Sequence, residues 1–155
     1  MNYIKIDNCD FNNGNGCRVV LWVSGCEHKC DGCHNKETWN HDAGKKFDAE
    51  TVDYITELMK NPFITGLTIT GGDPMLPSNR DEIFALMFFI KHAFPKKDIW
   101  VWTGYELDDV IDDIYLADVV IDGKYEKDNK TNKKWRGSDN QKMWVNVGGA
   151  FKLYD

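Results

Sequence analysis

Three cysteines in one short stretch are the residues of this chain best suited to metal chemistry. Cys26, Cys30 and Cys33 lie in the stretch SGCEHKCDGCHN, residues 24–35, directly after the apolar run of residues 19–23. That run is typical of a buried strand, so the cysteines are expected on the loop that follows it. Three thiolates on a tight loop can hold a metal ion or an iron–sulfur cluster. They leave one coordination position for a group from elsewhere.

Length and composition limit the classes of protein that can use such a loop. The 155 residues, 42% of them hydrophobic and 13% aromatic, predict a single folded domain over residues 1–155. The net charge of -6 argues against a nucleic-acid partner. The lysine-rich residues 124–134 also contain Glu126 and Asp128, which indicates a solvated loop.

The chain lacks an N-terminal signal pattern and any apolar run of about 18 residues, so we expect a cytoplasmic protein without a membrane partner. Cysteines in that compartment stay reduced, which favours metal binding or catalysis over disulfides. Cys9 and Cys17 lie outside the cluster of three. They are either further ligands or, the favoured interpretation, small buried hydrophobic residues.

The elements that position the cysteine loop alternate between strands and helices. Asp48 is a predicted N-cap for a helix that runs to Lys60, and Pro62 prevents its continuation. Residues 3–6 form a short alternating stretch, and residues 12–16 predict a hairpin or tight loop that leads into the first buried strand, residues 19–23. Residues 36–39 predict a short turn, and residues 40–46 a polar connection. Further helices are expected at 81–94 and 107–114, and further strands at 67–70, 98–102, 119–121, 143–147 and 151–154.

This alternation, with nearly continuous apolar strands, predicts an α/β fold with a mainly parallel sheet covered by helices. Right-handed connections place the carboxyl ends of such strands on one edge, where ligand sites form. Each strand end carries glycine, aspartate or cysteine, at residues 25–26, 71–73, 103–104 and 122–123. The sequence therefore predicts one site at this edge.

Cysteines spaced in this way resemble the signature of radical S-adenosylmethionine (SAM) enzymes. Over nearly its full length the chain also resembles the activating proteins of the anaerobic, class III ribonucleoside-triphosphate reductase. The stretches that carry the resemblance are residues 13–18, 25–35, 38–39, 71–74, 98–105, 122–124 and 135–141. The Trp-Thr-Gly-Tyr piece at 102–105 and the Arg-Gly-Ser piece at 136–138 make it more specific than the cysteines alone.

The resemblance implies a short, incomplete (βα) partial barrel of the radical SAM type. About residues 123–155 would then be a C-terminal extension and a candidate partner-docking segment. Within it, Arg136 with Asn140 and Gln141 forms either a docking segment or a hydrogen-bonded structural turn. Asp122 is either a helix cap or turn residue, or a ribose contact.

The resemblance also implies two cofactors, a [4Fe-4S] cluster and SAM. Cys26, Cys30 and Cys33 would ligate three irons, and the amino and carboxylate groups of SAM would chelate the fourth. No catalytic side chain is implied beyond the cluster and SAM. The residues implied to bind SAM are Gly71, Gly72 and Asp73 at the methionine end, Gly32, Cys33 and His34 at the adenine, and Thr103 and Gly104 near the ribose.

The implied reaction is reductive cleavage of SAM, followed by removal of a hydrogen atom from a glycine in the large subunit of the reductase. An external electron donor such as a flavodoxin would supply the electron. Two residues depart from the family pattern: His34 stands where tyrosine is frequent, and Asn15 where proline is frequent.

Three alternatives stay open. The protein could activate another glycyl-radical enzyme. It could instead be a zinc module whose site His28 or His34 completes, or an electron-transfer protein with Cys9 or Cys17 as fourth ligand. His28 is otherwise expected near the cluster or in solvent rather than as a ligand.

Overall fold

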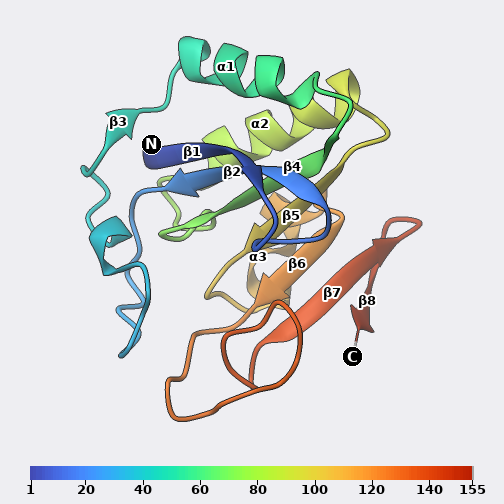
Figure 1. Ribbon diagram of the computed structural model, residues 1–155. Helices are drawn as coiled ribbons and strands as arrows, with labels where there is room; N and C mark the ends of the chain where they lie inside the picture. The colour runs from blue at the N-terminus through green and yellow to red at the C-terminus, as the bar shows by residue number, and fades with distance from the viewer. Residues whose placement is uncertain (155) are drawn as a thin grey trace.

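A computed structural model describes residues 1–154. Its strands and helices follow one another in the order expected from the sequence (Figure 1). Helix α3 and strand β5 have the predicted bounds, and the other predicted elements begin or end within a few residues of them. The elements are β1 (Asn2–Asp10), β2 (Cys17–Val23), the 3-10 helix η1 (Lys36–Thr38), β3 (Lys45–Lys46), α1 (Ala49–Met59), β4 (Ile64–Gly71), α2 (Arg80–Ala93), β5 (Asp98–Trp102), α3 (Leu107–Ile114), β6 (Val119–Asp122), β7 (Lys142–Val147) and β8 (Ala150–Tyr154).

All eight strands belong to one open sheet in the order β3-β1-β2-β4-β5-β6-β7-β8. Strands β2, β4, β5 and β6 are parallel and form its centre. The pairs that flank them, β1 with β2 and β3, and β7 with β6 and β8, are antiparallel. The predicted α/β class with a parallel central sheet is confirmed. The two-residue strand β3 lies in the stretch predicted to be only a connection.

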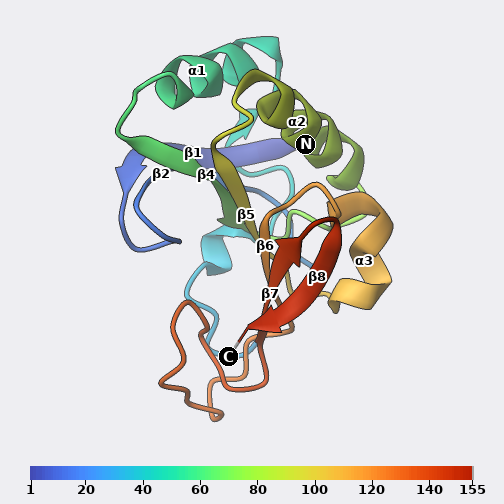
Figure 2. The ribbon, with the colours of Figure 1, turned by 90° about the vertical axis from the view of Figure 1, so that its right-hand side faces the viewer.

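Helices α1, α2 and α3 lie along one side of the sheet (Figure 2). Because side chains alternate along a strand, Ile99 and Val101 pack against the helices, while Trp100 and Trp102 belong to a cluster on the opposite face. Fully buried Leu, Ile, Val and Met residues of strands and helices form the main core. Within residues 1–154, no helix is both apolar enough and long enough to cross a lipid bilayer.

The face opposite the helices contains a buried charge, Arg18 of β2, whose side chain is 0% exposed. Its guanidinium pairs with Asp98 at 2.7 Å, donates to the Thr68 hydroxyl at 2.7 Å and lies 5.3 Å from the Trp100 ring centroid. Burial lowers the pKa of Arg18, and the carboxylate of Asp98 opposes that shift. These contacts tie β2, β4 and β5 together on the face opposite the helices.

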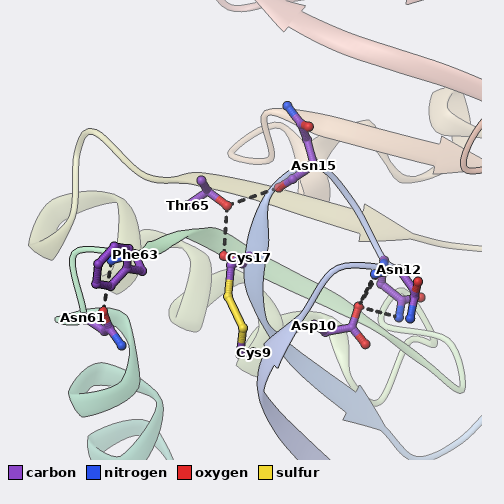
Figure 3. The surroundings of a disulfide bond; sticks show 9 residues. Cys9, Asp10, Asn12, Asn15, Cys17, Asn61, Phe63 and Thr65 are labelled. Carbon is purple, nitrogen blue, oxygen red and sulfur yellow. Dashed lines mark hydrogen bonds between the residues drawn. A yellow bond between two sulfur atoms is a disulfide. The ribbon is translucent and has the colours of Figure 1, made fainter.

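The hairpin of β1 and β2 contains a disulfide between Cys9 and Cys17 (Figure 3). The expectation that the cysteines outside the loop are reduced was therefore wrong, as was the interpretation of these two as buried hydrophobic residues, because Cys9 is exposed and Cys17 half-buried. Antiparallel pairing brings their Cα atoms to 5.5 Å, within the range that a disulfide requires. Their sulfurs are bonded to each other, so neither is a fourth ligand in this structure.

Helix α1 begins as predicted, with Asp48 as its N-cap. The Asp48 carboxylate accepts a hydrogen bond from the Thr51 backbone N–H at 3.0 Å, and the Thr51 hydroxyl accepts one from the Asp48 N–H. The first of these bonds lowers the pKa of Asp48 below its usual 3.8. A depressed pKa means that the cap stabilises the fold at neutral pH and that this contribution is lost as the pH falls below about 4.

We expect Asp48→Ala to lower the melting temperature at pH 7 by about 2–4 °C, because the first turn loses its acceptor. The difference between this variant and the original protein should shrink as the pH is lowered from 5 to 2. Asp48→Ser, which caps without a charge, is the control and should stay close to the original protein at pH 7. Circular dichroism melts over this range provide the measurement; an unchanged difference at pH 2 would contradict the assignment.

Candidate functional site

The carboxyl ends of the four parallel strands surround a cavity of about 140 Å³. The cysteine loop follows β2 and lies beside the strand ends, next to the segment that leaves β6 (Figure 1). The predicted convergence at one edge is therefore found. Of the predicted site residues, those that line the cavity are Cys26, Cys30, Cys33, Gly71, Gly72, Asp73, Thr103 and Gly104.

All three loop cysteines are free and half-buried, and all three line this one cavity. The loop is held in place by backbone hydrogen bonds, from Cys26 N–H to the Trp39 carbonyl at 3.2 Å and from Cys33 N–H to the Cys30 carbonyl at 3.1 Å. Burial raises the pKa of the Cys26 thiol to about 11. At neutral pH that thiol is protonated in the metal-free protein, so metal binding there releases a proton.

Asp73 is the centre of the hydrogen-bond network at the strand ends. Its side chain is 1% exposed, and its carboxylate accepts bonds from the Thr103 hydroxyl at 2.7 Å, the Gly104 N–H at 2.9 Å and the Met75 N–H at 2.9 Å. His28 Nε2 lies 2.6 Å from the same carboxylate. The carboxylate thus joins the ends of β4 and β5 to the cysteine loop.

His28 is more closely engaged than the sequence indicated. Its side chain is 8% exposed, its ring packs edge-on against Tyr105 at 4.5 Å, and a Cβ at Gly104 would come within 2.5 Å of it. With Cys26 and Asp73 it presents three potential ligand atoms within 4.8 Å of one another. His28 and Gly104 also line a second hollow, the acidic hollow, next to the cysteine cavity.

The glycines at the end of β4, Gly71 and Gly72, allow two strand ends to approach closely. A Cβ at Gly72 would lie 2.5 Å from the carbonyl oxygen of Gly25, and Gly71 has a φ of +105°. Both positions exclude a larger residue because backbone, not a side chain, fills the space. The N–H of Asp73 donates to the same Gly25 carbonyl at 2.6 Å, which fixes the cysteine loop against β4.

Two predicted site residues, Gly32 and His34, do not line the cavity. Gly32 packs against Lys127, where a Cβ would meet the lysine side chain at 2.9 Å, and the His34 ring lies 5.5 Å from that of Tyr125. Lys127 also pairs with Asp31 at 2.8 Å. The segment after β6 therefore covers the outer side of the cysteine loop.

That covering segment is built around Gln141, which the sequence left open as a structural or docking residue. Its side-chain oxygen accepts from Gly137 N–H at 2.7 Å and Ser138 N–H at 3.1 Å, and its amide donates to the Gly123 carbonyl at 3.0 Å. For Gln141 the structural turn is confirmed. Asp122 is likewise a cap: it accepts the N–H of Leu107 at the start of α3, at 2.7 Å.

Several residues that line the cavity were not among the predicted cluster ligands and SAM contacts, although His28 was an alternative ligand and Gly123 one of the predicted strand ends. A pattern of strand ends would have found Thr70 and Trp102, which immediately precede predicted site residues. Tyr125 and Gln141 come from a loop whose path no local pattern specifies. The additional lining residues are His28, Asn35, Thr38, Trp39, Thr70, Trp102, Gly123, Tyr125 and Gln141.

Comparison with known proteins identifies the class to which this fold and site belong. Residues 12–144 match the family described as a 4Fe-4S single cluster domain. The chain is 52% identical to the anaerobic ribonucleoside-triphosphate reductase-activating protein of Enterobacteria phage T4, over 98% of this chain and 99% of the other. It is 43% and 41% identical to the proteins of the same name from Pasteurella multocida and Escherichia coli K12, over 91% of this chain and 95% and 96% of theirs.

The chain therefore belongs to the family of anaerobic ribonucleoside-triphosphate reductase-activating proteins, with a 4Fe-4S cluster domain.

Proposed function

We propose that this protein is a radical SAM activase that generates a glycyl radical on the large subunit of an anaerobic ribonucleotide reductase. The observation that carries the proposal is the cavity in which three free cysteines meet the Gly-Gly-Asp and Thr-Gly strand ends. The names of the relatives support the choice of the reductase as target. On this proposal the sheet is a short radical SAM partial barrel.

The residues present fit a [4Fe-4S] cluster with one iron left open. Cys26, Cys30 and Cys33 are free thiols on one cavity, and within residues 1–154 the other two cysteines are joined in a disulfide elsewhere. The buried Nε1 of Trp39, another lining residue, has no hydrogen-bond partner there, as expected if a bound group supplies one. Three ligands from the protein leave the fourth position to SAM.

When bound, the cluster and SAM supply the one-electron cleavage of a carbon–sulfur bond, which gives methionine and a 5′-deoxyadenosyl radical that takes a hydrogen atom from glycine. The protein itself would bind and orient the cluster and SAM, and would exclude water from the site. Asp73 holds Thr103 and Gly104 in fixed positions at the edge where the ribose would lie. The Gly71-Gly72 backbone would face the methionine end.

The ammonium group of SAM would have to compete for the Asp73 carboxylate with the protein groups that already contact it. A carboxylate has about four acceptor positions, and four groups of the protein already lie within hydrogen-bond distance. The contact with His28 is the one whose loss frees an acceptor without breaking the strand ends apart. An ammonium group that bound to Asp73 would therefore take the place of the His28 ring, which lines both the cysteine cavity and the acidic hollow.

The adenine would be bound by Gly32, Cys33 and His34 of the cysteine loop. Tyr125 and Lys127 pack there and would order the loop around the nucleoside. An external electron donor such as a flavodoxin would reduce the cluster. The segment after residue 123, which covers the cysteine loop, would dock the reductase.

Anaerobic incubation with SAM, dithionite and the reductase tests the proposal. We expect 5′-deoxyadenosine and methionine in equal amounts, together with a glycyl-radical signal by electron paramagnetic resonance. Samples without SAM, or with a different glycyl-radical enzyme in place of the reductase, should give no such signal. A colourless, zinc-containing protein that forms no 5′-deoxyadenosine would overturn the proposal.

A further inference from the structure

A third hollow, distinct from the cysteine cavity and from the acidic hollow that His28 lines, lies on the sheet face opposite the helices. It has a volume of about 530 Å³ and is bounded by β5, β6, β7, the turn before β2, and residues 133–136. We call it the basic groove. Its apolar walls include the buried Trp100 and Met143 and the partly exposed Trp135. Tyr154 of the edge strand β8, 55% exposed, borders it.

The charge of the groove is opposite to that of the chain. Lys133, Lys134 and Arg136 line it, and no acidic side chain does so among the described residues, although the whole chain has a net charge of -6. The Lys133 ammonium lies 3.5 Å from the Asp139 carboxylate, which partly compensates its positive charge. By contrast, the charged residues that line the acidic hollow are four acids and one lysine: Glu27, Glu106, Asp109, Glu126 and Lys124.

The groove is held in shape by the residues that connect it to the cysteine cavity. Trp135 has a φ of +67°, a left-handed conformation that a bulky residue adopts only where its surroundings impose it. Its ring packs edge-on against Trp100 at 5.6 Å, and its carbonyl accepts the indole N–H of Trp102 at 3.0 Å. Trp102 lines the cysteine cavity. The Trp102 side chain therefore connects the basic groove to the cysteine cavity.

The wall of the groove that residues 134–136 form is held in place by Arg136. Its guanidinium donates to the carbonyl of Lys134 at 3.1 Å and to the carbonyl of Tyr154 at 3.4 Å. These bonds attach residues 134–136 to the edge strand and leave the ammonium of Lys134 above the Trp135 ring, 5.2 Å from its centroid. Aromatic residues and arginine, which this concave surface combines, are enriched in protein–protein interfaces.

We propose that the basic groove binds an extended acidic segment of the reductase that also carries apolar side chains, and so anchors the reductase beside the cysteine cavity. The apolar walls would take the side chains, and Lys133, Lys134 and Arg136 would pair with carboxylates. The inference rests on the proposed function, because it takes the reductase as the partner. It assigns a docking role to Lys133, Lys134 and Trp135.

Charge reversal tests the groove. Lys133→Glu/Lys134→Glu changes two exposed residues, so the fold should be retained. Lys45→Glu/Lys46→Glu is the matched control, with the same change in net charge on exposed residues of β3, at the other end of the sheet. We expect the groove variant to bind the reductase at least about tenfold more weakly in an equilibrium titration, and the control to change binding less than about twofold.

Two further measurements separate this inference from the proposed function. Formation of 5′-deoxyadenosine without reductase should be equal in both variants and the original protein, because neither change touches the cavity. If none of them forms it, the proposed function fails while the binding result still stands. If all bind the reductase equally, the groove inference fails and the proposed function is unaffected.

A labelled heptapeptide identifies the chemistry of the occupant. The probe has a central glycine, an aromatic residue on each side of it and two acidic residues at each end; its control has asparagine and glutamine in place of the acids. The acidic peptide should bind the original protein more tightly than the neutral one, with a preference that decreases at about 0.5 M salt. Equal binding of both peptides would overturn the assignment of an acidic segment.

Discussion

Replacing Cys26 by alanine is expected to remove the cluster and, with it, the cleavage of SAM. The reason is the donor count, since only three free cysteines line the cavity and none of the other described cysteines can substitute. Iron should fall from about four atoms per chain to near zero. The rate of 5′-deoxyadenosine formation should fall by more than about a hundredfold, because loss of even an outer partner of a metal ligand costs 10–100-fold.

The matched control is the double variant Cys9→Ala/Cys17→Ala, which removes cysteines that are joined in a disulfide on the β1–β2 hairpin. It should keep its iron, its brown colour and its activity, although it can melt at a lower temperature. Iron analysis and visible absorption of anaerobically purified protein provide the comparison. Full iron content and activity in Cys26→Ala would show that the cluster is held elsewhere.

Replacing Asp73 by asparagine is expected to be the most destabilising change at the site. The side chain is 1% exposed, and its two oxygens receive the Thr103 hydroxyl, the N–H groups of Met75 and Gly104, and His28. Asparagine replaces one acceptor oxygen by a donor, which leaves buried N–H or O–H groups facing another donor. We expect a loss of about 2–4 kcal/mol in the free energy of unfolding.

Asp53→Asn provides the same chemical change on an exposed position of α1 and should alter stability by less than about 0.5 kcal/mol. Thr103→Val removes one of the donors to Asp73 and the acceptor of the Tyr105 N–H, and should cost about 1–2 kcal/mol. Denaturant titrations of the cluster-free proteins give all three values on one scale. If Asp73→Asn is as stable as Asp53→Asn, the carboxylate is not the centre of the network.

The parts of this fold that follow local rules were predictable from the sequence. Asp48 and Pro62 mark the ends of α1, and the apolar runs of β2, β4, β5 and β6 predict a parallel centre. The convergence of residues 25–26, 71–73 and 103–104 also follows, because strands that run parallel have their carboxyl ends on the same edge of the sheet. None of these inferences needed a contact between distant segments.

The features that local rules missed depend on contacts between distant segments. Cys9 and Cys17 are joined because β1 and β2 pair with a particular register, which the turn residues alone do not determine. The packing of Tyr125 and Lys127 on the cysteine loop depends on the path of a long polar loop. The contact between His28 and Asp73 can be found only when the cysteine loop and the ends of β4 and β5 are placed in space.

Transfer of hydrogen from the reductase to SAM tests the central claim most directly. The reductase is prepared with deuterated glycine and incubated anaerobically with this protein, SAM and dithionite, and the 5′-deoxyadenosine is analysed by mass spectrometry. The account predicts one deuterium in the 5′-deoxyadenosine, together with a glycyl radical on the reductase. A glycyl radical accompanied by 5′-deoxyadenosine without deuterium would contradict it.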